Sequence, residues 1–119
     1  MEKLEFLDQR VFKDLKNENT EFDKNPIHYF SEADFETVLK RAAYLGIGIY
    51  TIEAFLDNKS FASYSHEDRH KKATDSKWFT RVFLTLKTRQ EGLLYAATYK
   101  VSAKLLLREG DLTIKEKEE

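Results

Sequence analysis

A string of charged residues at positions 66–70, His-Glu-Asp-Arg-His, matches the pattern H-E-x-x-H. In a zinc hydrolase, this spacing places two imidazoles on one helix face around the metal, and the glutamate activates a bound water. Such a helix is buried among apolar neighbours, whereas this string has charged residues at its centre and two lysines after it. His28 is the only other histidine, so no third ligand is evident. We expect a solvated loop and no metal site; a zinc hydrolase would use His66, Glu67 and His70.

A second pattern lies at residues 96–106, AATYKVSAKLL, which resembles the centre of a helix-turn-helix. Small alanines would lie in the first helix, Val-Ser at the turn and Leu106 in the second helix. However, Lys100 stands where such turns usually carry glycine. We favour a strand at about 93–100 and a short helix at 102–109, ended by Gly110. The phosphate contacts of the helix-turn-helix alternative would be Lys100, Lys104 and Arg108.

Other catalytic templates lack their required residues. The chain has no cysteine, which excludes disulfides, thiolate zinc sites and cysteine nucleophiles. Ser63 and Ser65 lie near His66, but no G-x-S-x-G turn surrounds them. The four glycines are scattered and form no phosphate-binding loop. Glu53 is the one carboxylate inside an apolar strand, where we expect it to pair with a lysine or arginine.

Composition predicts one folded domain of modest size. The 119 residues include 41% hydrophobic and 13% aromatic residues, enough to build a core. Twenty Lys and Arg against 21 Asp and Glu give a formal charge of −1, far from that of a dedicated nucleic-acid binder. We expect a single domain over 1–112, with helix 1–16 as a semi-detached or docked arm, and a disordered charged tail at 113–119.

Localisation is inferred from simple patterns. The beginning of the chain carries glutamates, where a secretory signal would carry basic residues. The longest uncharged stretch, 42–52, is much shorter than the roughly 20 residues of a membrane-spanning helix. We expect a cytoplasmic protein with no membrane partner and no cofactor.

The periodicity of the chain predicts the elements that position these residues. Apolar residues at helical spacing predict an amphipathic helix at 1–16, and 17–26 reads as a connecting loop. Ser31 begins a helix at about 32–45 as a cap, with Asp34 at the third helical position, and Gly46 ends it. A further amphipathic helix at about 76–91, capped by Thr74 or Asp75, precedes Gly92.

Between these helices the pattern changes to that of strands. In residues 47–56, both the odd-numbered and the even-numbered positions carry apolar residues, as in a central strand that is covered on both faces. Residues 57–60 read as a loop and 61–65 as the second strand of a hairpin. The predicted fold is α+β: a two-layer sandwich in which a small, mainly antiparallel sheet (hairpin about 47–65 plus strand about 93–100) is covered by helices 32–45 and 76–91.

The function expected from these observations is non-enzymatic. Aromatic residues are enriched at protein interfaces, and this near-neutral chain carries six tyrosines and one tryptophan without a catalytic motif. Our leading hypothesis is a protein-binding or regulatory module that binds another protein or itself. DNA binding through residues 93–109 is the second hypothesis, and zinc hydrolysis is the third.

Overall fold

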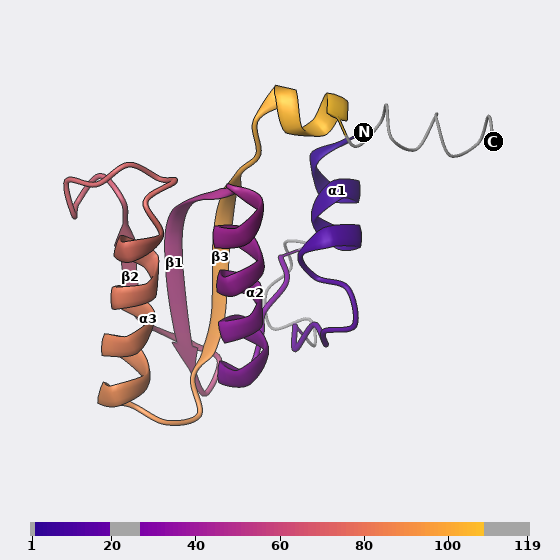
Figure 1. The fold of residues 1–119 in the computed structure, drawn as a ribbon. Coiled ribbons are helices and arrows are strands. Elements are labelled where there is room, and N and C mark those ends of the chain that lie inside the picture. Colours follow the sequence, from indigo (N-terminus) through magenta and orange to yellow (C-terminus); the bar gives the residue numbers. More distant parts are fainter. Residues whose placement is uncertain (1, 20–26, 109–119) are drawn as a thin grey trace.

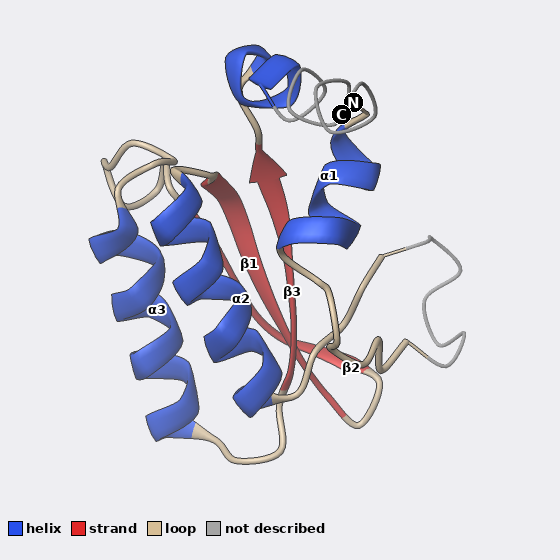
Figure 2. Ribbon diagram, turned by 45° about the vertical axis from the view of Figure 1, so that its right-hand side comes forward, coloured by secondary structure: helices blue, strands red, loops and turns tan. Residues whose placement is uncertain are grey.

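The computed structural model describes residues 2–19 and 27–108. Along the chain these form α1 (Lys3–Arg10), α2 (Glu32–Leu45), β1 (Gly48–Leu56), β2 (Lys59–Ser65), α3 (Ser76–Arg89) and β3 (Leu94–Lys100). A short helix at 103–108 follows β3. The strands form one antiparallel sheet in the order β2-β1-β3. Helices α2 and α3 lie side by side against one face of this sheet (Figures 1 and 2), so the predicted α+β sandwich is confirmed.

Both ends of α2 follow from its sequence. The Ser31 Oγ accepts a hydrogen bond from the Asp34 N–H at 3.3 Å, which satisfies one of the donors exposed in the first turn. Gly46 has φ 74°, a left-handed conformation that glycine adopts without strain. The Ile47 N–H then donates back to the Ala42 carbonyl at 2.9 Å. The predicted helix at 32–45 is therefore confirmed at both ends.

The hairpin is tighter than the sequence suggested. Asp57 and Asn58 both have positive φ, 51° and 65°, as a two-residue type I′ turn requires. Lys59 and Ser60, predicted to be loop, consequently belong to β2 and pair with Leu56 and Phe55 of β1.

Strand β1 is central, as predicted, but the helices cover only one of its faces. The side chains of Ile49, Ile52 and Ala54 are buried beneath α2 and α3. On the opposite face, Thr51 and Glu53 are only half-buried. The prediction that both faces are covered was wrong, because α2 and α3 both lie on the same face of the sheet (Figure 2). Tyr50, at the register shift between Ile49 and Thr51, is 38% exposed.

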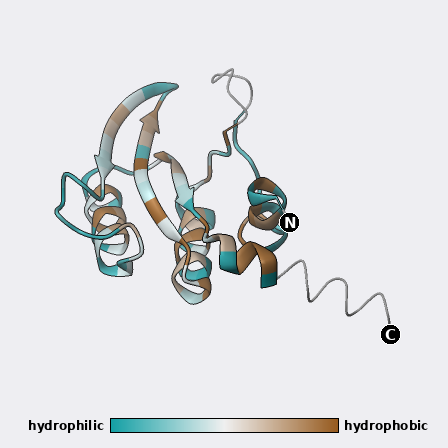
Figure 3. Cartoon of the chain, turned by 90° about the horizontal axis from the view of Figure 1, so that it is seen from above, coloured by the Kyte–Doolittle hydropathy of each residue, from teal (hydrophilic) through white to brown (hydrophobic). Residues whose placement is uncertain are grey.

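Helix α3 is capped by Asp75, whose Oδ1 accepts from the Lys77 N–H at 3.0 Å. The helix ends at Arg89 rather than at 91, because Gln90 is already extended, and Gly92 with φ 74° turns the chain toward β3. Its buried stripe is the predicted one: Trp78, Phe79, Val82, Phe83 and Leu86. On β3, Tyr95 stacks on Phe35 of α2 at a centroid distance of 5.2 Å. Viewed from above in Figure 3, sheet and helices form two layers, each carrying hydrophobic segments.

The N-terminal helix is shorter than predicted, because α1 ends at Arg10 rather than at residue 16. The chain turns immediately after it, and Asp14 has φ 64°. The carbonyls of Val11 and Lys13 bond to the Arg41 guanidinium of α2 at 2.9 and 2.8 Å, so they are engaged outside the helix. The helix is docked, since Phe6 and Leu7 are buried in the core.

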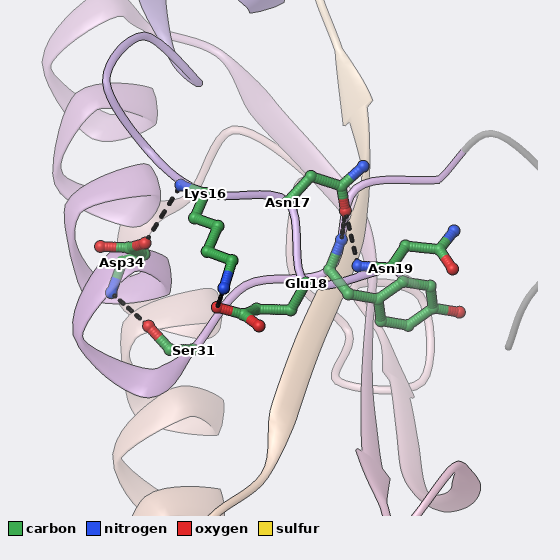
Figure 4. Close-up of polar contacts among 7 residues, drawn as sticks. Lys16, Asn17, Glu18, Asn19, Ser31 and Asp34 are labelled. Atoms are coloured by element: carbon green, nitrogen blue, oxygen red, sulfur yellow. Dashed lines mark hydrogen bonds and ion pairs between the residues drawn. The ribbon is translucent and has the colours of Figure 1, made fainter. Parts of the chain in front are cut away.

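Polar contacts join the segment after α1 to the beginning of α2 (Figure 4). The Lys16 N–H donates to Asp34 Oδ2 at 3.3 Å. The Asn17 Oδ1 accepts from the N–H groups of Asn19 and Tyr29, both at 3.0 Å. Phe30 exchanges two backbone hydrogen bonds of 2.8 Å with Tyr95, which covers part of the outer edge of β3.

Some predictions fall on residues that lie outside the described ranges. They concern part of the connecting loop, the end of the last helix at Gly110 and the charged tail at 113–119.

Candidate functional site

The H-E-x-x-H string does not lie on a helix. Residues 66–70 form successive turns after β2, and His70 has φ 56°. The His66 Nδ1 lies 2.8 Å from the Lys71 carbonyl oxygen, and its Nε2 lies 3.8 Å from Glu67 Oε1. The ring is therefore engaged with its own turn, and the i,i+4 geometry of a helical zinc site is absent from this segment. Within residues 2–19 and 27–108, no group of three or more potential ligands is placed to hold a metal.

The helix-turn-helix alternative lacks its first helix. Residues 94–100 form β3, paired with β1 along its length, and residues 103–108 form a short helix. Lys100, Lys104 and Arg108 are all exposed, but they are divided between the end of a strand and one helix. Of the two alternatives for 93–109, the described residues, which end at 108, show a strand followed by a helix.

The structure places Ser65 at the turn after β2 and Glu53 on the central strand of the sheet. The Ser65 Oγ accepts from the Asp68 N–H at 3.1 Å and so orders the turn after β2. Glu53 lies on the face of the sheet away from the helices, between Ser63 of β2 and Ala96 of β3. Among the described residues no lysine or arginine forms an ion pair with Glu53, which differs from the pairing that its position in the sequence suggested.

Positive charge is concentrated in one segment of the chain, although the formal net charge of the whole chain is only −1. Residues 66–89 carry seven Lys and Arg against three Asp and Glu, a formal charge of +4. Because the whole chain carries −1, the remaining residues carry −5. Helix α3 itself has no acidic residue, and its cations are Lys77, Arg81, Lys87 and Arg89. Helix α3 therefore carries a local formal charge of +4.

A shallow apolar groove runs between α2 and α3 on the surface of the helical layer. We call it the α2–α3 groove; its volume is about 180 Å³. Its lining consists of Glu36, Leu39, Lys40, Ala43, Ser76, Thr80, Phe83, Leu84 and Lys87. Leu84, one of these lining residues, is 48% exposed. An apolar hollow with an exposed leucine in its lining can accept an apolar group of another molecule.

The rim of this groove is charged. The Lys40 Nζ lies 3.3 Å from Glu36 Oε1, an exposed i,i+4 pair that is worth little. The Lys87 Nζ lies 5.5 Å from the Phe83 ring centroid and makes no ion pair within the described ranges. The rim thus presents positive charge that the chain leaves uncompensated on this face.

The sequence carried one signal for this groove that our sequence analysis missed. Leu84 interrupts the polar side of an amphipathic helix, because Lys77, Arg81 and Thr88 share its exposed face. An apolar residue outside the buried stripe departs from the amphipathic pattern of the helix. The contribution of α2 could not be read in this way, because it depends on how the two helices pack.

No helix within the described ranges is both long enough and apolar enough to cross a bilayer. A comparison of the chain with protein-family models, curated proteins and solved structures finds no match.

Proposed function

We propose that this chain is a non-enzymatic protein-binding module that uses the α2–α3 groove as its docking surface. The partner we propose is a protein segment with an apolar side chain flanked by carboxylates. The observation that carries this proposal is the exposure of Leu84 at an apolar groove whose rim is positively charged.

The size of the groove favours a side chain over a small-molecule ligand. Pockets that enclose drug-sized ligands measure about 300–1,000 Å³, whereas this groove measures about 180 Å³. It can accept an apolar side chain of a partner on a floor formed by Leu39, Ala43 and Phe83.

The charge of the surface favours an acidic partner. Lys87 on the rim, and Lys77 and Arg81 farther along α3, make no ion pair within the described ranges. Carboxylates on a partner would match these cations and speed association. A nucleic acid would use the cations but would leave the apolar floor without a matching group, so an acidic protein segment fits this surface better.

The sheet edges are less suited to docking by strand addition. In β2, the register shifts between Ala54 and Phe55 of β1, so Phe61 has no pairing partner there. A bulge and a charged residue such as Lys59 on an edge strand discourage further pairing. On β3, Phe30 already occupies the outer edge at Tyr95.

The proposal is tested by selecting ligands from a random peptide library displayed on phage, with the full chain as bait. We expect enrichment of peptides that combine an apolar residue with Asp or Glu. A selected peptide, labelled for fluorescence anisotropy, should bind Leu84→Arg at least about tenfold more weakly than the original chain, as at an interface hot spot.

The matched control is Leu107→Arg, which introduces the same charge at a leucine that is 67% exposed on the short helix after β3. It should bind like the original chain. Selection of lysine-rich peptides, equal binding by Leu84→Arg, or enrichment only of sequences from this chain itself would contradict the proposal; the last would indicate self-association.

A further inference from the structure

A second hollow adjoins the beginning of α3 and shares no lining residue with the α2–α3 groove. It has a volume of about 320 Å³ and lies between the turns that follow β2 and the first two turns of α3. Four of its lining residues are cations: Arg69 and Lys71 from the turns, and Lys77 and Arg81 from the helix. The linings of this hollow and of the α2–α3 groove share no residue, although Lys77 and Arg81 also belong to the cations of α3 named for the proposed function.

The four cations outnumber the two carboxylates around this hollow. Within residues 2–19 and 27–108, none of them lies within 4.0 Å of a carboxylate oxygen in an ion pair. The Arg69 guanidinium carbon lies 5.8 Å from the Tyr64 ring centroid, its one described charge-related contact. Elsewhere the chain places carboxylates beside its lysines, as at Lys16 and Glu18. Like charges around one hollow repel each other, and an anion within it would relieve that repulsion.

Two carboxylates also line the hollow, and they lower the formal charge that an anion would neutralise. Asp75 is engaged as the cap of α3, since its Oδ1 accepts from the Lys77 N–H at 3.0 Å. Asp68 is exposed. With four cations and two carboxylates, the formal charge of the lining is +2. Because Asp75 already caps the first turn, the side chains rather than the helix terminus supply the attraction.

We infer that this hollow binds a dianionic phosphate group, either as free phosphate or as a phosphate monoester. A dianion neutralises the formal charge of the lining, and its oxygens accept charge-assisted hydrogen bonds from arginine and lysine. The volume lies at the lower end of the range for ligand pockets, which suits a small polar group.

Trp78 provides the means to observe binding. It is the only tryptophan in the chain, it lines the hollow, and it is 3% exposed. Its indole Nε1 donates to the Ala73 carbonyl at 3.4 Å, so the ring is connected to the segment just before α3. Ordering of the surrounding cations by an anion should change its fluorescence.

The test is a fluorescence titration of the full chain with inorganic phosphate at constant ionic strength, with chloride as the balancing anion. We expect a saturable change in Trp78 emission. Arg69→Gln and Arg81→Gln should each weaken phosphate binding at least about fivefold, because each removes a charge-assisted hydrogen bond. Arg81→Lys, which keeps the charge, should weaken it less than Arg81→Gln. Lys104→Gln, outside the hollow, should bind phosphate as the original chain does, and circular dichroism verifies that each variant folds.

Two further probes distinguish the source of the phosphate. A phosphoserine peptide that binds more tightly than both free phosphate and its unphosphorylated form would assign the site to a monoester; equal or weaker binding than free phosphate would assign it to the free anion. The inference is overturned if phosphate and chloride give the same response, if Arg69→Gln and Arg81→Gln bind phosphate normally, or if duplex DNA alters the fluorescence while phosphate does not.

Discussion

Arg41 joins the N-terminal segment to the helical layer through one guanidinium nitrogen. Its Nη1 donates to the carbonyls of Val11 and Lys13, at 2.9 and 2.8 Å. We predict that Arg41→Ala lowers the free energy of unfolding by about 1–3 kcal/mol, because hydrogen bonds from a charged donor are lost. Urea denaturation measures the loss, and hydrogen exchange should quicken in α1. Lys59→Ala, an exposed substitution, should change stability by less than about 0.5 kcal/mol. Unchanged exchange in α1 would contradict this role of Arg41.

Tyr95 and Tyr99 have buried hydroxyl oxygens that make no hydrogen bond within the described ranges. Burial raises the pKa of Tyr99, and burial with a smaller effect of the Glu32 charge raises the pKa of Tyr95 to about 12. Because the folded chain holds these protons more tightly than the unfolded chain, their contribution to stability is complete below about pH 10 and is lost as the pH rises further.

We therefore predict that Tyr99→Phe is within about 1 kcal/mol of the original stability at pH 7, because the removed hydroxyl has no partner. Above pH 10, its unfolding free energy should fall less steeply than that of the original chain. Urea denaturation at pH 7 and at a pH above 10 measures this difference. Tyr44→Phe, at an 88% exposed position, is the control. A loss of about 2 kcal/mol or more for Tyr99→Phe at pH 7 would show that the hydroxyl has a stabilising partner.

At the scale of elements, Gly48 allows β1 to approach the segment before α3. A Cβ at this position would lie 3.2 Å from the carbonyl carbon of Ala73 and 3.1 Å from the Cβ of Lys100. The Ala73 oxygen accepts from the Ile49 N–H at 2.9 Å, so a movement of this segment away from β1 would stretch that bond. We predict that Gly48→Ala destabilises the fold by about 1–3 kcal/mol through overpacking.

The measurement for Gly48→Ala is thermal unfolding followed by Trp78 fluorescence, since that ring also contacts Ala73. Ser63→Ala, at an exposed strand position, is the matched control and should unfold with the original chain. If Gly48→Ala unfolds at the same temperature as the original chain, the segment at Ala73 moves to accommodate the added methyl group and the prediction is wrong.

The elements were predictable where local chemistry determines them. Ser31 and Gly46 mark the ends of α2 by cap geometry alone, and the stripe of α3 follows from its period. The end of α1 was not predictable, because it depends on Arg41, which lies about thirty residues away in the sequence. Likewise, the open face of β1 was not predictable from its apolar residues, because it depends on α2 and α3 packing against the same face of the sheet (Figure 2).

At the scale of the whole molecule, the sheet and the helical layer have different surfaces. The face of the sheet away from the helices carries small polar side chains, and the Oγ1 atoms of Thr51 and Thr98 lie 2.8 Å apart on it. The helical layer carries the positive charge of α3 and the exposed Leu84. The sequence showed the cations of this site, but only the packing of α2 against α3 creates the groove between them.

Docking of a partner on the α2–α3 groove can be followed residue by residue through amide chemical shifts. The labelled full chain is titrated with a peptide selected by phage display, and the shift changes are mapped by residue. We expect the largest changes within 36–44 of α2 and 76–87 of α3, with little change at Thr51, Glu53 and Thr98 on the open face of the sheet. Changes concentrated on that open face or along β2, with α2 and α3 unaffected, would contradict docking on the groove.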